Sequence, residues 1–158
     1  QVITWIGGRA CSRPGVLPWN DVTWTDARDA CEAANARLCT RDEWLLACGG
    51  NGGLSYPYGN SFRSALCNGQ GFDADPNLDG NQDEAVACGS IQSCEIGGVY
   101  DMSGNLKEWT SDTIGNLRAV RGGGYSTVLA GGMTCQQDND WKDRRFHHRS
   151  IGFRCCVD

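Results

Sequence analysis

Oxygen-donating side chains crowd into one acidic stretch of the chain, residues 75–86. Through its ninth position this stretch follows the ligand order of an EF-hand loop, with Asp75, Asn77, Asp79, Gly80, Asn81 and Asp83. The twelfth position, which should carry a bidentate Glu, is Val86. Because such clusters also form ordinary solvated turns, two interpretations stay open: a calcium loop that departs from the EF-hand pattern, or an acidic turn.

Cysteine is the second residue type that could do chemistry, with 10 copies in 158 residues. An even number of thiols in so short a chain favours disulfides and an oxidising compartment, so we expect a secreted, periplasmic or cell-surface protein. No Cys-x-x-Cys pair occurs, and the only two histidines, His147 and His148, are adjacent. Structural zinc is therefore disfavoured, and we expect the histidines to be exposed polar residues of a loop.

Composition excludes several classes of protein. The net charge is −5 and no basic run is longer than Arg144–Arg145, which argues against a nucleic-acid partner. No apolar run reaches the roughly 18 residues of a membrane span, and Gln1 is followed by no signal segment. One domain over residues 1–158 is expected, because a chain of this length can bury an ordinary core.

Two helices are predicted in the first third of the chain. Over residues 23–36, Ala27, Ala30, Cys31 and Ala34 recur at helical spacing, with Thr23 as the N-cap. The second helix begins at a capping box formed by Thr40 and Glu43, and the pair Gly49-Gly50 ends it. Its buried stripe is Trp44, Leu45 and Cys48.

Residues 51–98 show neither helical nor strand periodicity and predict a long structured loop. A loop of this length in a compact domain needs disulfides or bound cations to hold it. Short apolar segments at 98–100, 118–121 and 151–156 then predict strands of a small antiparallel sheet.

Separated motifs carry a family resemblance. They read Arg37-Leu38-Cys39-Thr40-Arg41-Asp42-Glu43-Trp44, Tyr56-Pro57-Tyr58-Gly59-Asn60, Gly98-Val99-Tyr100-Asp101-Met102-Ser103-Gly104-Asn105-Leu106-Lys107-Glu108-Trp109, Arg121-Gly122-Gly123-Gly124-Tyr125 and Gly152-Phe153-Arg154-Cys155. In this order and spacing the chain resembles the formylglycine-generating enzyme (sulfatase-modifying factor) family from about Val22 to Cys156. The resemblance implies an α+β fold of the C-type-lectin-like kind, with two helices on a small twisted antiparallel sheet and long loops pinned by disulfides and calcium.

The resemblance also locates the catalytic centre of the family, which holds copper on two cysteines after the Gly-Gly-Ser-aromatic element. The corresponding positions after Tyr125 are Thr127 and Gly132. Neither residue can replace a soft thiolate ligand of Cu(I). We therefore expect a non-catalytic member of the family with no catalytic residues.

Calcium is the cofactor that the resemblance implies. One family site corresponds to the side chains of Asp101 and Glu108 with the carbonyls of Gly104 and Leu106. A second site corresponds to Asn68, the carbonyl of Gly69, Asp83 and the carbonyl of Ala85. This second ligand set competes with the EF-hand-like one for Asp83, and both alternatives stay open. Convergent carboxylates and carbonyls are the ligands that a hard cation needs.

We expect every cysteine to be paired: Cys11, Cys31, Cys39, Cys48, Cys67, Cys88, Cys94, Cys135, Cys155 and Cys156. The implied fold makes Cys31 and Cys48 the partners of Cys155 and Cys156. Cys88–Cys94 would close a small local loop, and Cys67 is assigned to Cys135. Spacing alone does not fix such pairings.

Three functions remain under consideration. The first is a binding or structural module, whose ligand, a glycan or protein, would contact Trp141, Arg144, Arg145 and His147 in the segment 126–150, which is variable in folds of this type. Burial under a loop is the alternative for Trp141. The second function is a divergent formylglycine-generating oxidase, and the third is a subunit or excised domain of a larger surface assembly.

Overall fold

The computed structural model describes residues 3–6, 9–73 and 84–158, with side chains from residue 13 onward. Two helices, α1 (Trp24–Ala33) and α2 (Arg41–Gly49), accompany ten short strands and a 3-10 turn, η1 (Ala130–Met133). The strands are β1 (Ile3–Ile6), β2 (Arg9–Ser12), β3 (Arg37–Leu38), β4 (Glu95–Ile96), β5 (Val99–Tyr100), β6 (Lys107–Ile114), β7 (Leu117–Arg121), β8 (Trp141–Asp143), β9 (Ile151–Phe153) and β10 (Cys155–Cys156). No helix among the described residues is long and apolar enough to cross a bilayer.

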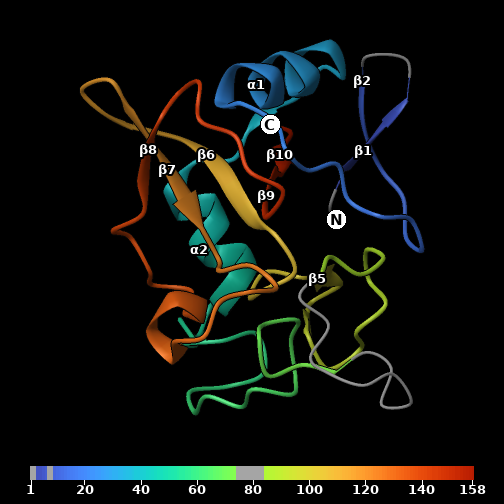
Figure 1. Ribbon diagram of the computed structural model, residues 1–158, viewed down its shortest axis with the longest axis vertical. Coiled ribbons are helices and arrows are strands. Elements are labelled where there is room, and N and C mark those ends of the chain that lie inside the picture. Colours follow the sequence, from blue (N-terminus) through green and yellow to red (C-terminus); the bar gives the residue numbers. More distant parts are fainter. Residues whose placement is uncertain (1–2, 7–8, 74–83) are drawn as a thin grey trace.

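The main sheet has four strands in the order β8-β7-β6-β9, and three two-stranded ribbons pair β1 with β2, β3 with β10 and β4 with β5. In Figure 1, α1 lies across one end of the sheet and α2 runs along one face. All three predicted strand segments contain strands, although 151–156 is divided into β9 and β10. The prediction that they share one sheet is wrong, because β5 and β10 belong to the ribbons and only β7 and β9 lie in the main sheet. One pair departs from the antiparallel prediction: β9 runs parallel to β6, because the connection after β8, residues 144–150, returns the chain to the end of the sheet where β6 begins.

Helix α1 begins where the sequence predicts. Thr23 caps the helix, because its Oγ1 accepts a hydrogen bond from Asp26 N. The Asp26 carboxylate in turn accepts from Thr23 N, which completes a capping box. The predicted small-residue face is buried at Ala27, Ala30 and Cys31. Small side chains let the helix approach the sheet closely, where Trp109 and Phe153 belong to the same apolar cluster.

Helix α2 also follows its local signals. The predicted capping box is present, with Thr40 Oγ1 accepting from Glu43 N and Glu43 Oε2 accepting from Thr40 N. Trp44 and Cys48 are buried and pack with Met102 and Cys135. The helix ends at Gly50, whose φ of 62° is a conformation that favours glycine.

Glu43 joins this cap to the preceding strand. Its two carboxylate oxygens accept hydrogen bonds from Arg37 Nη1 and Nη2, both at 2.7 Å. This ion pair, together with the hydrogen bonds from Thr40, lowers the pKa of Glu43 to about 2. The charged carboxylate therefore stabilises the fold above its unfolded pKa near 4.5, and that contribution is lost as the pH falls toward 2.

We expect Glu43→Gln to lower the free energy of unfolding by about 1 kcal/mol at pH 7, a modest value because solvent screens these half-exposed side chains. The amide keeps the capping box but loses the ion pair. Urea titrations at pH 7 and pH 3 measure the effect, and the difference between variant and wild type should shrink at pH 3. An equal difference at both pH values would show that the charge of Glu43 contributes nothing.

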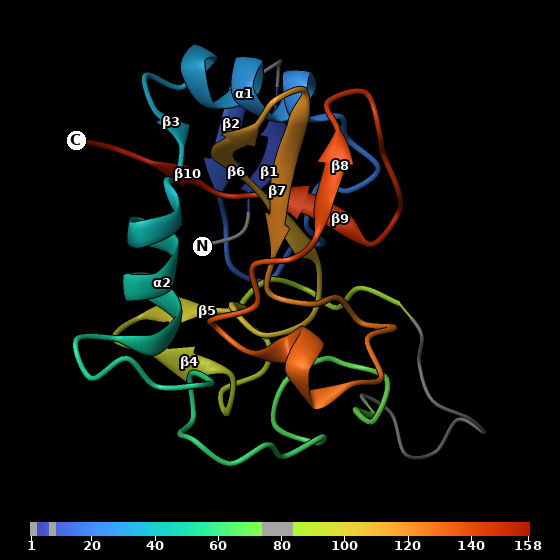
Figure 2. The same ribbon diagram turned by 90° about the vertical axis from the view of Figure 1, so that its left-hand side faces the viewer.

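Two further apolar clusters complete the core below the sheet. Figure 2 shows α2 along one side and the loops after it gathered at the end opposite α1. In these loops Tyr56 stacks on Tyr58 with ring centroids 5.3 Å apart, and Tyr56 also clusters with Ile91 and Met133. Between α2 and β4 the described residues form no helix or strand beyond the bridge of Tyr56 to Gly59, as the sequence predicts.

Among the described side chains, four disulfides cross-link the chain: Cys31–Cys155, Cys39–Cys156, Cys48–Cys135 and Cys67–Cys94. The pairing of Cys31 with the last strand is confirmed. The assignments of Cys48 to that strand, Cys67 to Cys135 and Cys88 to Cys94 are wrong. Strand β10 pairs with β3, and this brings Cys156 to Cys39 rather than to α2. The long loop is cross-linked by Cys67–Cys94 instead of by the predicted Cys67–Cys135. Each disulfide contributes roughly 2–4 kcal/mol to the free energy of unfolding.

Cys88 carries a free thiol and is buried, while the side chain of Cys11 lies outside the described residues. Burial and the nearby Asp101 carboxylate raise the pKa of the Cys88 thiol to about 12, so almost no thiolate exists at neutral pH.

In a Cys11→Ser variant, we expect Cys88 to resist alkylation in the native state and to react fully after unfolding. Iodoacetamide labelling at pH 8, followed by mass spectrometry, should detect under about 5% modification in an hour natively and one added group per chain in urea. Rapid native labelling would contradict the buried thiol.

Candidate binding pocket

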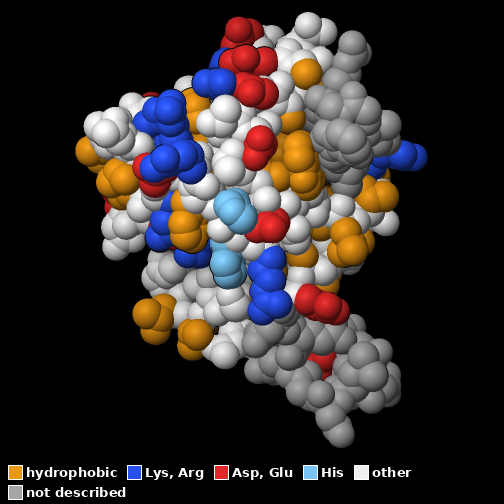
Figure 3. Space-filling model, turned by 45° about the horizontal axis from the view of Figure 1, so that its top comes forward, with side chains coloured by type: hydrophobic (Ala, Val, Ile, Leu, Met, Phe, Trp, Pro, Cys, Tyr) orange, Lys and Arg blue, Asp and Glu red, His pale blue; other side chains and the backbone are white. Residues whose placement is uncertain are grey.

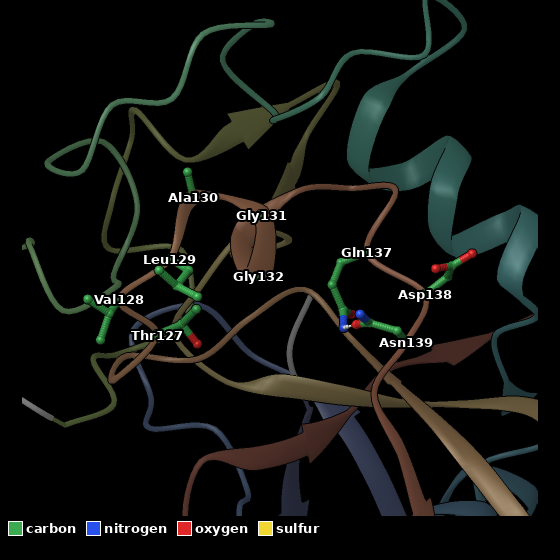
Figure 4. A pocket seen from close by; sticks show the side chains of 9 residues that line it. All are labelled: Thr127, Val128, Leu129, Ala130, Gly131, Gly132, Gln137, Asp138 and Asn139. Carbon is green, nitrogen blue, oxygen red and sulfur yellow. Dashed lines mark hydrogen bonds between the residues drawn. The ribbon is translucent and has the colours of Figure 1, made fainter.

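A cavity of about 880 Å³ lies between two parts of the segment that joins β7 to β8. One wall is made by Thr127, Val128 and Leu129, the floor by Ala130–Gly132, and the other wall by Gln137, Asp138 and Asn139. In Figure 4 the side chains of Gln137 and Asn139 meet, joined by a hydrogen bond of 2.8 Å, whereas Asp138 points away from them. The pocket therefore offers an apolar wall opposite amide groups.

The first wall and the floor are held by contacts with residues distant in sequence. Tyr56 donates its hydroxyl to Ala130 O at 3.2 Å, and Ser103 donates to Met133 O. Gly123, with φ of 66°, lies close to the floor of the pocket, because an added Cβ would be 2.7 Å from both Gly132 O and Met133 Sδ. Glycine is required there by both conformation and space.

The second wall is anchored by a disulfide and a buried arginine. Cys135 is bonded to Cys48 of α2. Arg121, only 1% exposed, donates from Nη1 to Gln137 O at 3.0 Å, and burial lowers its pKa. Arg121 was not predicted as a site residue, although it opens the Arg121–Tyr125 motif. It is a positioning residue, because it holds the backbone of the wall without lining the cavity.

Thr127 and Gly132, the two positions where the resembled family carries copper-binding cysteines, lie side by side. A Cβ atom added to Gly132 would lie 2.9 Å from Thr127 Cγ2. Thr127 Oγ1 is already engaged, accepting from Gly124 N at 2.9 Å. The two positions thus converge in space while their side chains are a hydroxyl bound to the backbone and a hydrogen atom. Neither is a ligand for Cu(I).

The rim of the pocket exposes apolar side chains. Val128 is 64% exposed and Leu129 is 74% exposed. A smaller cavity of about 200 Å³, which includes Phe62 and Gln70, shares Thr127 and Val128 with the main pocket. Neighbouring exposed apolar residues beside a cavity are typical of binding surfaces.

The four predicted ligand-binding residues do not form one site. Trp141 is half-buried and donates to Asp138 O at 2.9 Å, so it supports the second wall of the pocket from behind. His147 is exposed and its Nδ1 lies 2.9 Å from Asp21 Oδ1. His148 is exposed too, as predicted, and contacts Ser150. Arg144 and Arg145 line a different cavity beside β8.

The predicted calcium ligand Asn68 has an unusual environment. It is 1% exposed, and its Nδ2 donates to Glu84 O at 3.0 Å and to Asn105 Oδ1 at 3.1 Å. Its side-chain oxygen is buried without a hydrogen-bond partner in the part of the chain that is described. A buried, unpaired acceptor is costly, and an oxygen-seeking cation would satisfy it. Asp83 and the EF-hand-like residues 75–83 lie outside the described residues, whereas Gly69 and Ala85 lie within them.

The other predicted calcium site is already occupied in part by protein groups. Asp101 accepts from Gly89 N through one oxygen and leaves the other unpaired, and burial raises its pKa. Glu108 accepts from Arg154 Nε at 3.0 Å and Nη2 at 2.8 Å and from Trp44 Nε1 at 2.8 Å. Glu108 is thus neutralised by Arg154, so its carboxylate does not fit the role of a free ligand beside Gly104 and Leu106. Within the described residues, no group of three or more His, Cys, Asp or Glu side chains is arranged to hold a metal.

Comparison with known proteins matches residues 6–158 to the model of the sulfatase-modifying factor enzyme 1-like domain. A mouse protein named inactive C-alpha-formylglycine-generating enzyme 2 is 33% identical over 123 residues, which are 73% of this chain and 40% of that protein. The serine/threonine-protein kinase pkn1 of Chlamydia caviae is 31% identical over 94% of this chain and 25% of its own length. The chain therefore spans less than half of either relative.

Solved structures of similar fold include Treponema denticola variable protein 1, with a TM-score of 0.67 and 14% identity, covering 88% of this chain and 70% of that one. PvdO from Pseudomonas aeruginosa has a TM-score of 0.69 and 16% identity, covering 95% and 68%. At these identities the likeness concerns the fold alone.

Proposed function

This chain belongs to the family of sulfatase-modifying factor enzyme 1-like domains, and from that premise we propose that it is a non-catalytic, extracellular binding module whose ligand occupies the pocket between Thr127 and Asn139. The observation that carries the proposal is that Thr127 and Gly132, at the two positions where the resemblance places copper ligands, lie side by side in this pocket and offer no thiolate. A mouse relative of this chain is itself named an inactive enzyme.

The pocket favours a glycan or a protein segment as its ligand. Its apolar rim at Val128 and Leu129 can be covered by a ligand's apolar surface, while the amides of Gln137 and Asn139 both donate and accept hydrogen bonds. The disulfides of the described residues support an oxidising environment. One of them, Cys48–Cys135, anchors the second wall, which reduces the entropy cost of binding.

A variant that fills the pocket tests this function. Gly131 lines the cavity, does not require a left-handed backbone, and an added Cβ would meet no atom within 4 Å. Gly131→Trp should therefore fold normally and block the pocket. Gly52 in the exposed loop after α2 has the same freedom, so Gly52→Trp is the matched control.

Wild-type protein and both variants are applied to glycan and peptide arrays with and without calcium. At least one ligand that binds the wild type and Gly52→Trp equally should lose at least tenfold in affinity with Gly131→Trp. If every ligand of the wild type bound Gly131→Trp with full affinity, or if the wild type bound no ligand, the proposed function would be wrong.

We also propose that calcium stabilises the loop around Asn68. The side-chain oxygen of Asn68 and the carbonyls of Gly69 and Ala85, with Asp83, would hold the ion, which supplies a positive centre that joins the two ends of the loop. The support is the unpaired buried oxygen of Asn68.

Calcium should raise the melting temperature of the wild type above its value in excess chelator. Asn68→Ala and Asn105→Gly both remove the bond between the two amides, but only the first removes the unpaired oxygen, and glycine accepts the φ of 63° at Asn105. The calcium-induced increase should vanish in Asn68→Ala and persist in Asn105→Gly. An identical melting curve with calcium and with chelator would eliminate the site.

A further inference from the structure

A second cavity, of about 380 Å³, lies beside the main sheet and away from the binding pocket. It is enclosed by the turn between β6 and β7 and by the turn that follows β8, and its lining consists of Asn116, Arg118, Asp143, Arg144 and Arg145. Figure 3 shows Lys and Arg side chains gathered on the side of the molecule that bears β7 and β8. This cavity is polar and rich in guanidinium groups.

Its arginines are held in place by the fold. Arg118 lies opposite Lys142 in the β7–β8 pair, and its guanidinium stacks over the ring of Trp24 at 4.7 Å from the centroid. Arg118 Nη1 also donates to Leu117 O at 3.0 Å. The backbone of Arg144 is tied to the start of α1, because Trp24 N donates to Arg144 O at 3.1 Å. The guanidinium of Arg118 and the backbone of Arg144 are therefore held in place by the fold.

The charges in this cavity do not balance. Asp143 is its only carboxylate, and one oxygen, Oδ1, accepts from both N and Nε of Arg145 at 2.9 and 3.1 Å. Those bonds lower the pKa of Asp143. Among the described residues no carboxylate lies within 4.0 Å of a nitrogen of Arg118 or Arg144. Three arginines against one aspartate leave two uncompensated positive charges, in a chain whose net charge is −5.

We propose that this cavity binds an acidic saccharide, with a sulfate or carboxylate group held by Arg118 and Arg144. Guanidinium groups suit such planar or tetrahedral oxyanions. The saccharide's hydroxyls match the amide of Asn116 and the second oxygen of Asp143, which accepts hydrogen bonds and would repel a purely anionic ligand. Phe146, which follows Arg145 in the chain and is 41% exposed, offers a ring for the apolar face of a sugar. An acidic peptide would bring carboxylates against Asp143 with few hydroxyl donors.

The test uses three probes in calorimetric titrations: a heparin hexasaccharide, a hyaluronan hexasaccharide and a poly-glutamate decapeptide. The first two separate sulfate from carboxylate as the recognised group, and the third reports a peptide ligand. Arg144→Gln is the primary variant, because the Arg144 side chain makes no hydrogen bond or ion pair among the described residues. Arg118→Gln is the second variant, with its melting temperature as a check of folding. Arg63→Gln, an equal change of charge at an exposed residue of the segment between α2 and β4, is the control.

One or both saccharides should bind the wild type, weaken as NaCl rises from 50 to 300 mM, and bind each cavity variant at least fivefold more weakly, while Arg63→Gln stays within twofold of the wild type. An equal loss of saccharide affinity in Arg63→Gln and Arg144→Gln would show that the saccharides bind by non-specific electrostatic attraction, which would overturn the proposal. Poly-glutamate binding as tight as the saccharides would make the ligand a peptide, and no binding by any probe would also overturn the proposal. Gly131→Trp should bind the saccharides normally, so this result is independent of the pocket.

Discussion

The double variant Thr127→Cys/Gly132→Cys should bind one Cu(I) ion, whereas we expect the wild type to bind none in the pocket. The two positions are already adjacent, since a Cβ on Gly132 would lie 2.9 Å from Thr127 Cγ2. Gly132 has no left-handed φ, and the only atom that its Cβ would press against belongs to Thr127, which the double variant also replaces. Two thiolates brought together in this way are soft ligands of the kind that selects Cu(I).

Anaerobic titration against a chromophoric Cu(I) chelator, after mild reduction of the new cysteine pair, measures the gain. We expect at least a hundredfold tighter binding than in the wild type, because two thiolates replace groups with no affinity for the ion. Thr127→Ser/Gly132→Ser controls for the change of shape, and Thr127→Cys alone shows whether one thiolate suffices. Failure of the double variant to bind, with its native disulfides intact by mass spectrometry, would mean that the pocket has diverged in more than these two side chains.

The elements that sequence predicts well are those set by neighbouring residues. Thr40 and Glu43 fix the start of α2 within one turn, and Ala27, Ala30 and Cys31 define the buried face of α1 by spacing alone. Such capping and periodicity are local physics, and the structure confirms them.

Features that depend on distant contacts were predicted poorly. Strand β6 (Lys107–Ile114) was not predicted, because its charged start was interpreted as a calcium-binding segment. In the structure Glu108 lies within this strand and pairs with Arg154. Disulfide partners failed for the same reason: Cys39 reaches Cys156 only because β3 pairs with β10.

The pocket itself could be anticipated only in part. The resemblance identified Thr127 and Gly132, but the second wall of the pocket is formed by Gln137–Asn139, a segment with no recognisable motif. That wall is placed by Arg121 and the Cys48–Cys135 bridge, both of them long-range contacts.

The ion pair of Glu108 with Arg154 yields the second large prediction. Both side chains are buried, with 2% and 6% of their surfaces exposed, and Glu108 also accepts from Trp44. Glu108→Gln keeps the shape of the side chain and removes its charge, which leaves the buried Arg154 guanidinium without its ion-pair partner. We expect this variant to lose about 3–5 kcal/mol of unfolding free energy, the usual cost of breaking a buried pair from one side.

The double variant Glu108→Gln/Arg154→Met is the control, since it removes both charges and should recover most of that loss. Urea titrations in calcium and in chelator measure all three proteins. If Arg154 alone balances the charge of Glu108, calcium should stabilise the double variant as much as the wild type, because neither substitution changes the proposed calcium site at Asn68. A calcium effect that disappears with Glu108 would instead return this carboxylate to the coordination sphere of a metal. The same titrations therefore decide which positive charge, an arginine or a bound ion, balances the most deeply buried acid among the described residues.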